Sequence, residues 1–281
     1  MNFGKTLLFL ITIGLASSTG YAQLNDHPST RTVLEKIRQQ CISILEKAYE
    51  NENSFIRGAA IRAAGESADP LMLPLLEKGV EDFYATNRLF ALQALQKMAP
   101  VKAFALANKL IDDPDLWVKI AALKVIGDAE KEESKNLIRP KLDSADLPVR
   151  LAAAAALYKL GDKEHLNLIL KTLKGGDVGD RYHAIGHLGR MGTDEALAQL
   201  RNLLNDKEDE IVFYSLKAIG VNAKLEILPN IRNLVRHRNP SIRYQAVLLL
   251  GYMPDENSIR WAREACKDDD AMVRLSAAVS L

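Results

Sequence analysis

The sequence predicts an all-α protein, a right-handed α-solenoid of eight helix-turn-helix repeats with a period of about 31 residues. Three observations support this prediction. One pattern of basic, small and aliphatic residues recurs at this period, apolar residues within each unit have helical spacing, and no strand pattern occurs. A unit of this length cannot bury its apolar side alone, so we expect the units to stack.

The recurrence is clearest at one basic position. The interval from Arg57 to Arg88, taken repeatedly along the chain, gives a basic residue at seven of eight positions: Arg57, Arg88, Lys119, Arg150, Arg181, Val212, Arg243 and Arg274. Three residues after each of these stands a small residue: Ala60, Ala91, Ala122, Ala153, Ala184, Ser215, Ala246 and Ala277. Small side chains allow neighbouring helices to approach closely, so this series predicts the second helix of each repeat.

Helix boundaries recur in the same register. An aspartate or asparagine stands four residues before several basic positions, where its side chain can cap the first turn of a helix: Asn53, Asp115, Asp146, Asp177, Asn239 and Asp270. In five repeats a glycine stands eight residues after this recurring position, and we expect left-handed helix ends there: Gly65, Gly127, Gly189, Gly220 and Gly251. The first helix of the first repeat is predicted from about Arg31 to Glu50.

Three segments link this pattern to a known family. Leu147–Ala153, Ser241–Ala246 and Met272–Ala278 resemble HEAT repeats, and the glycine-containing form with this period is similar to the HEAT-like repeats of phycobilisome lyases. The resemblance covers about residues 29–281. It implies that the second helices line a concave face, but solenoids of this kind serve many different partners.

Residues 1–22 have the pattern of a signal peptide. A short start with Lys5 precedes the apolar run Leu7–Leu15, and small residues follow up to Ala22. We expect cleavage near Ala22-Gln23, a short lead over residues 23–30, and the repeat solenoid over residues 31–281. The mature protein would then be periplasmic or secreted, with no membrane span after signal cleavage.

Composition and charge limit the partners. Hydrophobic residues make up 48% and charged residues 26% of the chain, which is typical of a soluble, core-forming protein. The formal net charge is +1, and loss of residues 1–22 removes Lys5 and no acidic residue. A neutral protein has no general field that attracts nucleic acid, so we expect no nucleic-acid partner.

The strongest candidate for a binding surface is a line of apolar and aromatic residues on the second helices. The position after the basic residue should be mostly exposed, yet it is occupied by Leu151, Tyr182, Phe213 and Tyr244, and the next exposed position of the seventh repeat by Leu248. Contiguous exposed apolar surface marks a partner site, with aromatic residues as anchors. The alternative interpretation is that these side chains fill gaps between repeats.

The sequence offers little support for catalysis. His183 and His187 have the spacing of a metal pair on one helix face, but no glutamate follows His183, so they form a weak candidate beside ordinary packing. The HEAT-fold hydroxylase that modifies a lysine derivative uses His-Glu dipeptides, and this chain has only the reverse order, Glu164-His165. We expect no catalytic residues and no cofactor.

Cys41 belongs to the first repeat and Cys266 to the eighth, so we expect no disulfide within one chain. Cys266 occupies a position that holds Leu173, Leu204 and Val235 in other repeats, which predicts a buried residue. The last residue, Leu281, falls on a core position, and this suggests homo-association through the C-terminal end.

Together these observations predict a non-catalytic scaffold outside the cytoplasm that binds a peptide or a protein segment along its concave face. One alternative is an accessory or regulatory subunit of an exported enzyme complex. The other alternative is a metal-dependent enzyme centred on His183 and His187.

Overall fold

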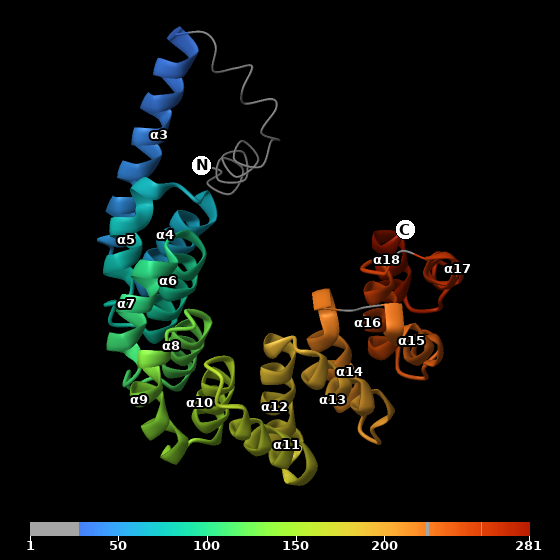
Figure 1. Cartoon of the computed structure of the whole chain (residues 1–281). Coiled ribbons are helices and arrows are strands. Elements are labelled where there is room, and N and C mark those ends of the chain that lie inside the picture. The colour runs from blue at the N-terminus through green and yellow to red at the C-terminus, as the bar shows by residue number, and fades with distance from the viewer. Residues whose placement is uncertain (1–27, 223–224, 254) are drawn as a thin grey trace. The chain divides into compact units, whose positions relative to one another are not determined.

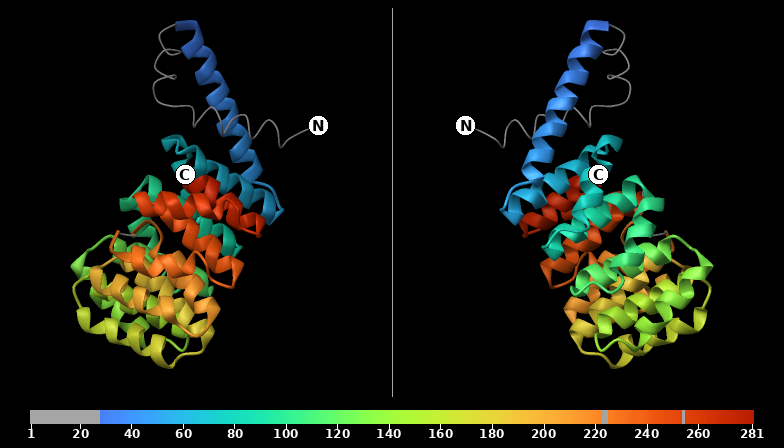
Figure 2. Two further views of the ribbon diagram at one scale, coloured as in Figure 1. Left: turned by 90° about the vertical axis from the view of Figure 1, so that its right-hand side faces the viewer. Right: turned by 90° about the vertical axis from the view of Figure 1, so that its left-hand side faces the viewer.

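A computed structural model describes residues 28–222, 225–253 and 255–281. The predicted signal peptide and most of the predicted lead lie outside these residues. The described residues form helices joined by short loops, with no strand among them (Figures 1 and 2). None of their helices has the length and apolar character needed to cross a membrane. The chain divides into unit 1, which ends at Lys131, and unit 2, Glu132–Leu281.

Unit 1 consists of helices that alternate between a first and a second helix of each repeat. Its first helices are α3 (Pro28–Tyr49), α5 (Leu73–Gly79), which follows the short 3₁₀ helix η1 (Pro70–Met72), and α7 (Pro100–Leu110). Its second helices are α4 (Ser54–Ser67), α6 (Ala85–Met98) and α8 (Leu116–Asp128). The first helix of the chain thus spans nearly the predicted range.

Unit 2 continues the alternation, with several first helices broken into short pieces. The first-helix segments are η2 (Glu132–Ser134), α9 (Lys135–Ile138) and η3 (Arg139–Asp143), then η4 (Lys163–His165) and α11 (Leu166–Gly175), α13 (Asp194–Asn202) and η5 (Leu203–Asn205), η7 (Leu225–Ile227) and α15 (Leu228–Leu234), and α17 (Glu256–Ala265). The second helices are α10 (Leu147–Lys159), α12 (Val178–Met191), α14 (Asp209–Ile219), which η6 (Gly220–Asn222) follows, α16 (Pro240–Leu250) and α18 (Ala271–Ser280).

The second helices form a continuous layer within each unit. In unit 1, α4 packs on α6 and α6 on α8, and in unit 2 the series from α10 to α18 packs in the same way. The first helices mainly contact the second helices on either side (Figure 1). The second helices therefore form the side of each stack that lies opposite the first helices.

Most predicted helix caps are present. The side chains of Asn53, Asp115, Asp177, Asn239 and Asp270 each accept a hydrogen bond from a backbone N–H in the first turn of the following helix. Asp146 occupies the same position before α10, but its side chain makes no such bond. A short polar side chain at this position therefore starts the second helix in most repeats.

The predicted role of the recurring glycines is wrong in most repeats. Gly65, Gly127 and Gly189 lie within helices, and of the five glycines only Gly220 has a positive φ, 37°. A Cβ on Gly65 would lie 2.6 Å from the Cβ of Ala94, and one on Gly189 would lie 2.7 Å from the carbonyl oxygen of Ala218. These two glycines are needed because the next second helix approaches their backbone too closely for a side chain.

The recurring arginine fastens the turn that precedes its own helix. In five repeats its Nη1 donates to the carbonyl oxygens five and six residues earlier, at distances of 2.6–3.2 Å: Arg57, Arg88, Arg150, Arg243 and Arg274. The guanidinium thus satisfies carbonyl groups of the turn that the helices leave unbonded.

The same arginine also binds the next repeat, in what we call the inter-repeat pair. Nε and Nη2 of Arg57, Arg88 and Arg243 donate to both carboxylate oxygens of an aspartate 25 residues later, at 2.6–3.0 Å. Arg181 pairs with its aspartate through Nη1 and Nη2. The four aspartates are Asp82, Asp113, Asp206 and Asp268.

Each of these four aspartates also caps its own turn, by accepting from the backbone N–H two residues later at 2.9–3.0 Å. The pair therefore joins the turns of two consecutive repeats with charge-assisted, bidentate hydrogen bonds. It is also partly shielded from solvent, since the Asp82 side chain is only 2% exposed. The pair fixes how far one second helix is displaced from the next.

The prediction for Cys266 is wrong. Leu173, Leu204 and Val235 are buried, whereas Cys266, which directly follows α17, is exposed. Cys41 is partly buried, and both thiols are unpaired.

A pair of glycine substitutions on α12 tests the close approach of second helices. Gly189→Ala should lower the free energy of unfolding by about 1–3 kcal/mol, because the new methyl group would overlap α14. Gly186→Ala is the matched control, since its Cβ would meet only the end of the Arg190 side chain, at 3.5 Å. The control should be neutral or stabilising by up to about 1 kcal/mol. Urea unfolding measures both, and equal effects would contradict the packing argument.

The inter-repeat pair also predicts a dependence of stability on pH. The hydrogen bond from Arg243 lowers the pKa of Asp268 and outweighs burial, which would raise it. Asp268 therefore stabilises the fold above its ordinary pKa of about 3.9, and this contribution disappears as the pH falls through the lower folded value. Asp268→Asn should lower the unfolding free energy by about 1–2 kcal/mol at neutral pH.

The difference in unfolding free energy between the parent and Asp268→Asn should become smaller below about pH 4. Asp269→Asn serves as the control, because Asp269 is an exposed neighbour outside the pair. Urea titrations at several pH values give the measurement. A difference in unfolding free energy that stays constant down to the pH of acid unfolding would show that the charge of the Asp268 carboxylate does not stabilise the fold.

Candidate binding face on the second helices of unit 2

An aromatic cluster lies on the second helices α12 and α14. The ring centroids of Tyr182 and Tyr214 are 4.4 Å apart, those of Phe213 and Tyr214 are 5.4 Å apart, and His183 lies 5.4 Å from Tyr182. These distances are those of favourable aromatic contacts. On the next second helix, α16, Tyr244 follows the recurring arginine in the same way as Tyr182 does on α12. We call Tyr182, Phe213, Tyr214 and Tyr244 the aromatic face.

The exposure of the aromatic face is graded. Tyr182 is 43% exposed, whereas Phe213, Tyr214 and Tyr244 are partly buried and pack against the core of unit 2. Leu248, one turn further along α16, is also partly buried. The rings therefore serve both as packing between repeats and as surface, and Tyr182 presents the largest accessible area among them.

Leu151 does not belong to this surface, so its prediction as an exposed stripe residue is wrong. Its side chain is 0% exposed and lies in the same core cluster as Ala184 and Ile185 of α12. The physical reason is the run of alanines that follows it on α10, which provides little bulk and allows α12 to pack over the leucine. The line of exposed residues therefore begins at Tyr182.

Tyr214 was not among the predicted site residues, although it joins Tyr182 to Phe213. The sequence contained a signal for Tyr214. It stands one repeat period after His183, and both residues directly follow a residue that was predicted to be exposed. On α12 and α14, two adjacent positions thus contribute to the cluster, and a search limited to one of them finds only part of it.

The two histidines of α12 have different surroundings. His187 is 5% exposed, and its Nδ1 lies 2.9 Å from Nη2 of Arg190. Burial lowers the pKa of His187 well below its usual value, and the charges of Arg190 and His183 act in the same direction. Burial also lowers the pKa of His183, which is partly buried. His187 is thus a neutral packing residue already bound to a cation, an unfavourable ligand for a metal ion.

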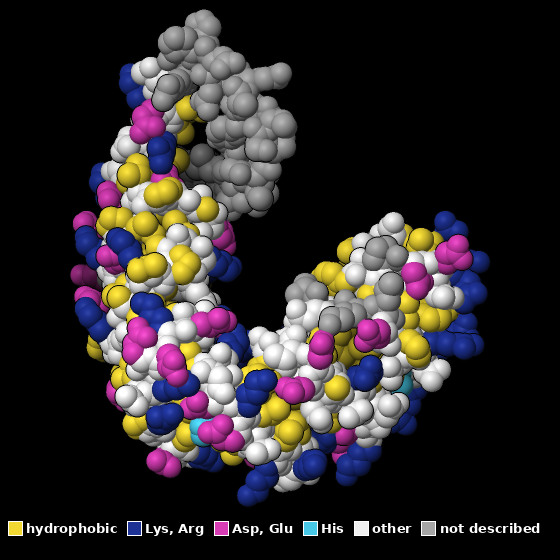
Figure 3. Space-filling model, viewed as in Figure 1, with side chains coloured by type: hydrophobic (Ala, Val, Ile, Leu, Met, Phe, Trp, Pro, Cys, Tyr) yellow, Lys and Arg dark blue, Asp and Glu magenta, His cyan; other side chains and the backbone are white. Residues whose placement is uncertain are grey.

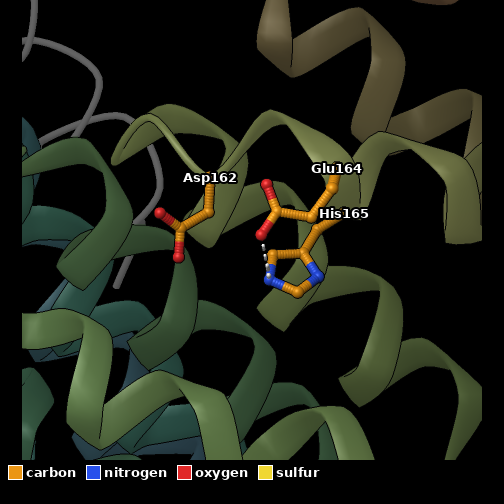
Figure 4. Close-up of side chains that lie close together, drawn as sticks. All are labelled: Asp162, Glu164 and His165. Carbon is orange, nitrogen blue, oxygen red and sulfur yellow. Dashed lines mark ion pairs between the residues drawn. The ribbon is translucent and has the colours of Figure 1, made fainter.

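One other group has suitable donors among the described residues, Asp162, Glu164 and His165, at the start of the fifth repeat (Figure 4). Asp162 accepts ion pairs from Lys135 at 2.9 Å and from Arg139 at 3.1 Å, and the hydrogen bond from Lys135 is the main cause of its lowered pKa. Glu164 lies 3.8 Å from Nε2 of His165. Two cations already neutralise Asp162, so the group is an ion-pair network.

The comparisons with known proteins agree with this architecture. The family model for HEAT repeats matches residues 103–181, 137–220 and 227–281. The chain belongs to the HEAT-repeat family. The comparison with curated proteins gives no match.

The search of solved structures gives, among its matches, a complex of CpcE and CpcF of phycocyanin lyase and a hydroxylase. The complex, from Nostoc sp. PCC7120, matches with a TM-score of 0.54 and 24% identity over 80% of this chain and 92% of that one. Human deoxyhypusine hydroxylase, with bound glycerol, matches with a TM-score of 0.42 and 14% identity over 89% of this chain and 97% of that one. At 24% identity the likeness to the CpcE–CpcF complex concerns the fold alone.

Charged side chains of both signs are interspersed over the surface drawn in Figure 3. At the last HEAT repeat, α18 exposes Met272, Leu275 and Val279 by 54%, 55% and 72%. Apolar surface is therefore present on α18 as well as on the aromatic face, and homo-association through that end stays a prediction.

The histidine environments predict that the protein holds no metal ion tightly. After dialysis against a buffer without chelator, we expect far less than one zinc ion per chain by elemental analysis, because His187 is buried against Arg190. Added zinc should not raise the unfolding temperature of the parent more than that of His183→Ala. Stoichiometric zinc that His183→Ala loses would instead support the metal-dependent enzyme.

Proposed function

We propose that this HEAT-repeat protein is a non-catalytic scaffold that binds a peptide or protein segment on the aromatic face of unit 2. The observation that carries the proposal is the group of four aromatic rings on three consecutive second helices, with Tyr182 43% exposed. Aromatic residues are over-represented among the residues that dominate binding energy at protein interfaces.

The packing of the rings supports a preformed surface. Phe213, Tyr214 and Tyr244 are held against the core, so their side chains lose little conformational freedom when a partner binds. The surrounding second helices are fastened by the inter-repeat pairs Arg181–Asp206 and Arg243–Asp268. A rigid row of aromatic rings suits an extended or helical segment with apolar side chains at regular intervals.

We further propose that the protein acts outside the cytoplasm after removal of residues 1–22. The apolar run Leu7–Leu15 followed by small residues up to Ala22 supports this location. The partner would then be a protein of the same compartment.

Affinity capture tests the scaffold function. Residues 23–281 would be used to capture partners from the native extracytoplasmic fraction, and the affinity of each partner would then be measured with purified components. Tyr182→Ala and Tyr244→Ala, singly and together, should weaken binding about tenfold or more, because they remove anchor rings.

The matched control is Phe83→Ala, which removes an aromatic side chain that is 88% exposed in unit 1. It should bind the partner as the parent does. Circular dichroism and the unfolding temperature must show that all variants are folded. Equal binding by the parent and both folded tyrosine variants would reject the aromatic face as the binding surface.

A further inference from the structure

One inter-repeat pair of unit 2 lacks its carboxylate. Arg150 occupies the recurring basic position of α10, and its Nη1 donates to the carbonyl oxygens of Ser144 and Ala145 at 2.6 and 2.8 Å, as in other repeats. The residue 25 positions later is Gly175, where Asp206 and Asp268 stand in later repeats of the same unit. Among the described residues, no aspartate or glutamate lies within ion-pair distance of Arg150.

The space beside Gly175, the last residue of α11, is open. A Cβ built on Gly175 meets no atom within 4 Å, and the glycine is exposed. Its φ lies outside the left-handed region, so the backbone there is one that an ordinary residue can adopt. The 14-residue helix α12 begins three residues later, at Val178.

The guanidinium retains the donors that the other pairs use. In the pairs of Arg57, Arg88 and Arg243, Nη1 binds the turn, whereas Nε and Nη2 bind the aspartate. Arg150 makes the same contacts with its turn through Nη1, so Nε and Nη2 are left for a carboxylate from elsewhere. Arg150 is partly buried, which strengthens an ion pair relative to one in bulk water.

Two acidic residues near Gly175 limit the charge of the anion that can bind. The side chain of Asp177 accepts from the backbone N–H of Asp180 at 2.8 Å and so caps α12, and Asp180 lies in the first turn of the helix. The negative charges of these two aspartates repel an anion at the site. They repel a multiply charged ion more strongly than a singly charged one. A single carboxylate matches both this limit and the bidentate geometry of the guanidinium better than a phosphate does.

We propose that Arg150 and the gap at Gly175 form a binding site for an external carboxylate. The ligand completes the inter-repeat pair between α10 and α12 that the chain itself leaves open. The carboxylate comes either from a small organic acid or from an acidic side chain of a bound protein. This site is separate from the aromatic face and does not depend on it.

The test compares two substitutions at Gly175 in the full chain. Gly175→Asp restores the aspartate of the other pairs, and Gly175→Asn adds a side chain of the same size without the charge. Gly175→Asp should raise the unfolding temperature above that of Gly175→Asn by about 2–4 °C, because the new carboxylate binds Arg150. Equal unfolding temperatures would show that Arg150 does not face the gap and would overturn the proposal.

Binding is measured by NMR from the Nε–H signal of Arg150, with acetate as the probe and chloride at matched ionic strength as the reference. The signal should shift with acetate in the parent, and the shift should be lost in Gly175→Asp, whose own carboxylate fills the site. Arg150→Lys, which removes the bidentate donor group, confirms the assignment of the signal. No acetate-specific shift in the parent, or the same shift in Gly175→Asp, would overturn the proposal.

Two peptides distinguish the sources of the carboxylate. A glutamate-containing peptide and its glutamine counterpart are titrated in the same way as acetate. Equal affinity for acetate and the glutamate peptide supports a small organic acid as the ligand. An affinity for the glutamate peptide at least tenfold above those for acetate and the glutamine peptide supports an acidic protein segment.

Discussion

The bidentate bond between an arginine of one repeat and an aspartate of the next is the interaction that recurs most regularly between stacked repeats, at four junctions. The arginine also binds two carbonyl groups of its own turn, and the aspartate accepts from the backbone of the following turn. Each pair therefore fixes two turns at once and sets the displacement between consecutive second helices. Hydrophobic packing alone is non-directional and would leave this displacement less well defined.

Close helix packing follows from the same constraint. With the turns held in register, α14 passes so near to α12 that only a glycine fits at position 189. The residue after the recurring arginine is buried in some repeats and exposed in others. Where the neighbouring side chains are alanines, as around Leu151, that residue becomes part of the core, and where they are aromatic, as around Tyr182, it reaches the surface.

Function on such a scaffold resides in the departures from the repeat. In a regular HEAT repeat, the apolar surfaces and charged groups are already paired with those of the neighbouring repeats. The aromatic face and the missing aspartate at Gly175 are two places where unit 2 departs from that regularity. One leaves apolar surface and the other leaves a cationic group without its internal carboxylate, and both are features that a binding partner can complete.

Much of the candidate site was visible in the sequence. Steps of one repeat period identify Tyr182, Phe213 and Tyr244, and the same steps could have identified Tyr214 and the aspartates that precede the second helices by a fixed spacing. The error at Leu151 arose because helical periodicity gives the direction of a side chain on its own helix, but not the size of the residues on the next one.

The sequence by itself determined the repeat length, the helix-turn-helix unit, most of the helix caps and the HEAT family, because these depend on local patterns that recur. Tertiary structure decided what each recurring position does. The glycines proved to be contact points between helices, His187 a buried neutral residue and Arg150 an arginine without its aspartate. Such roles depend on the distance to a neighbouring repeat, which the packing of side chains sets and no single repeat contains.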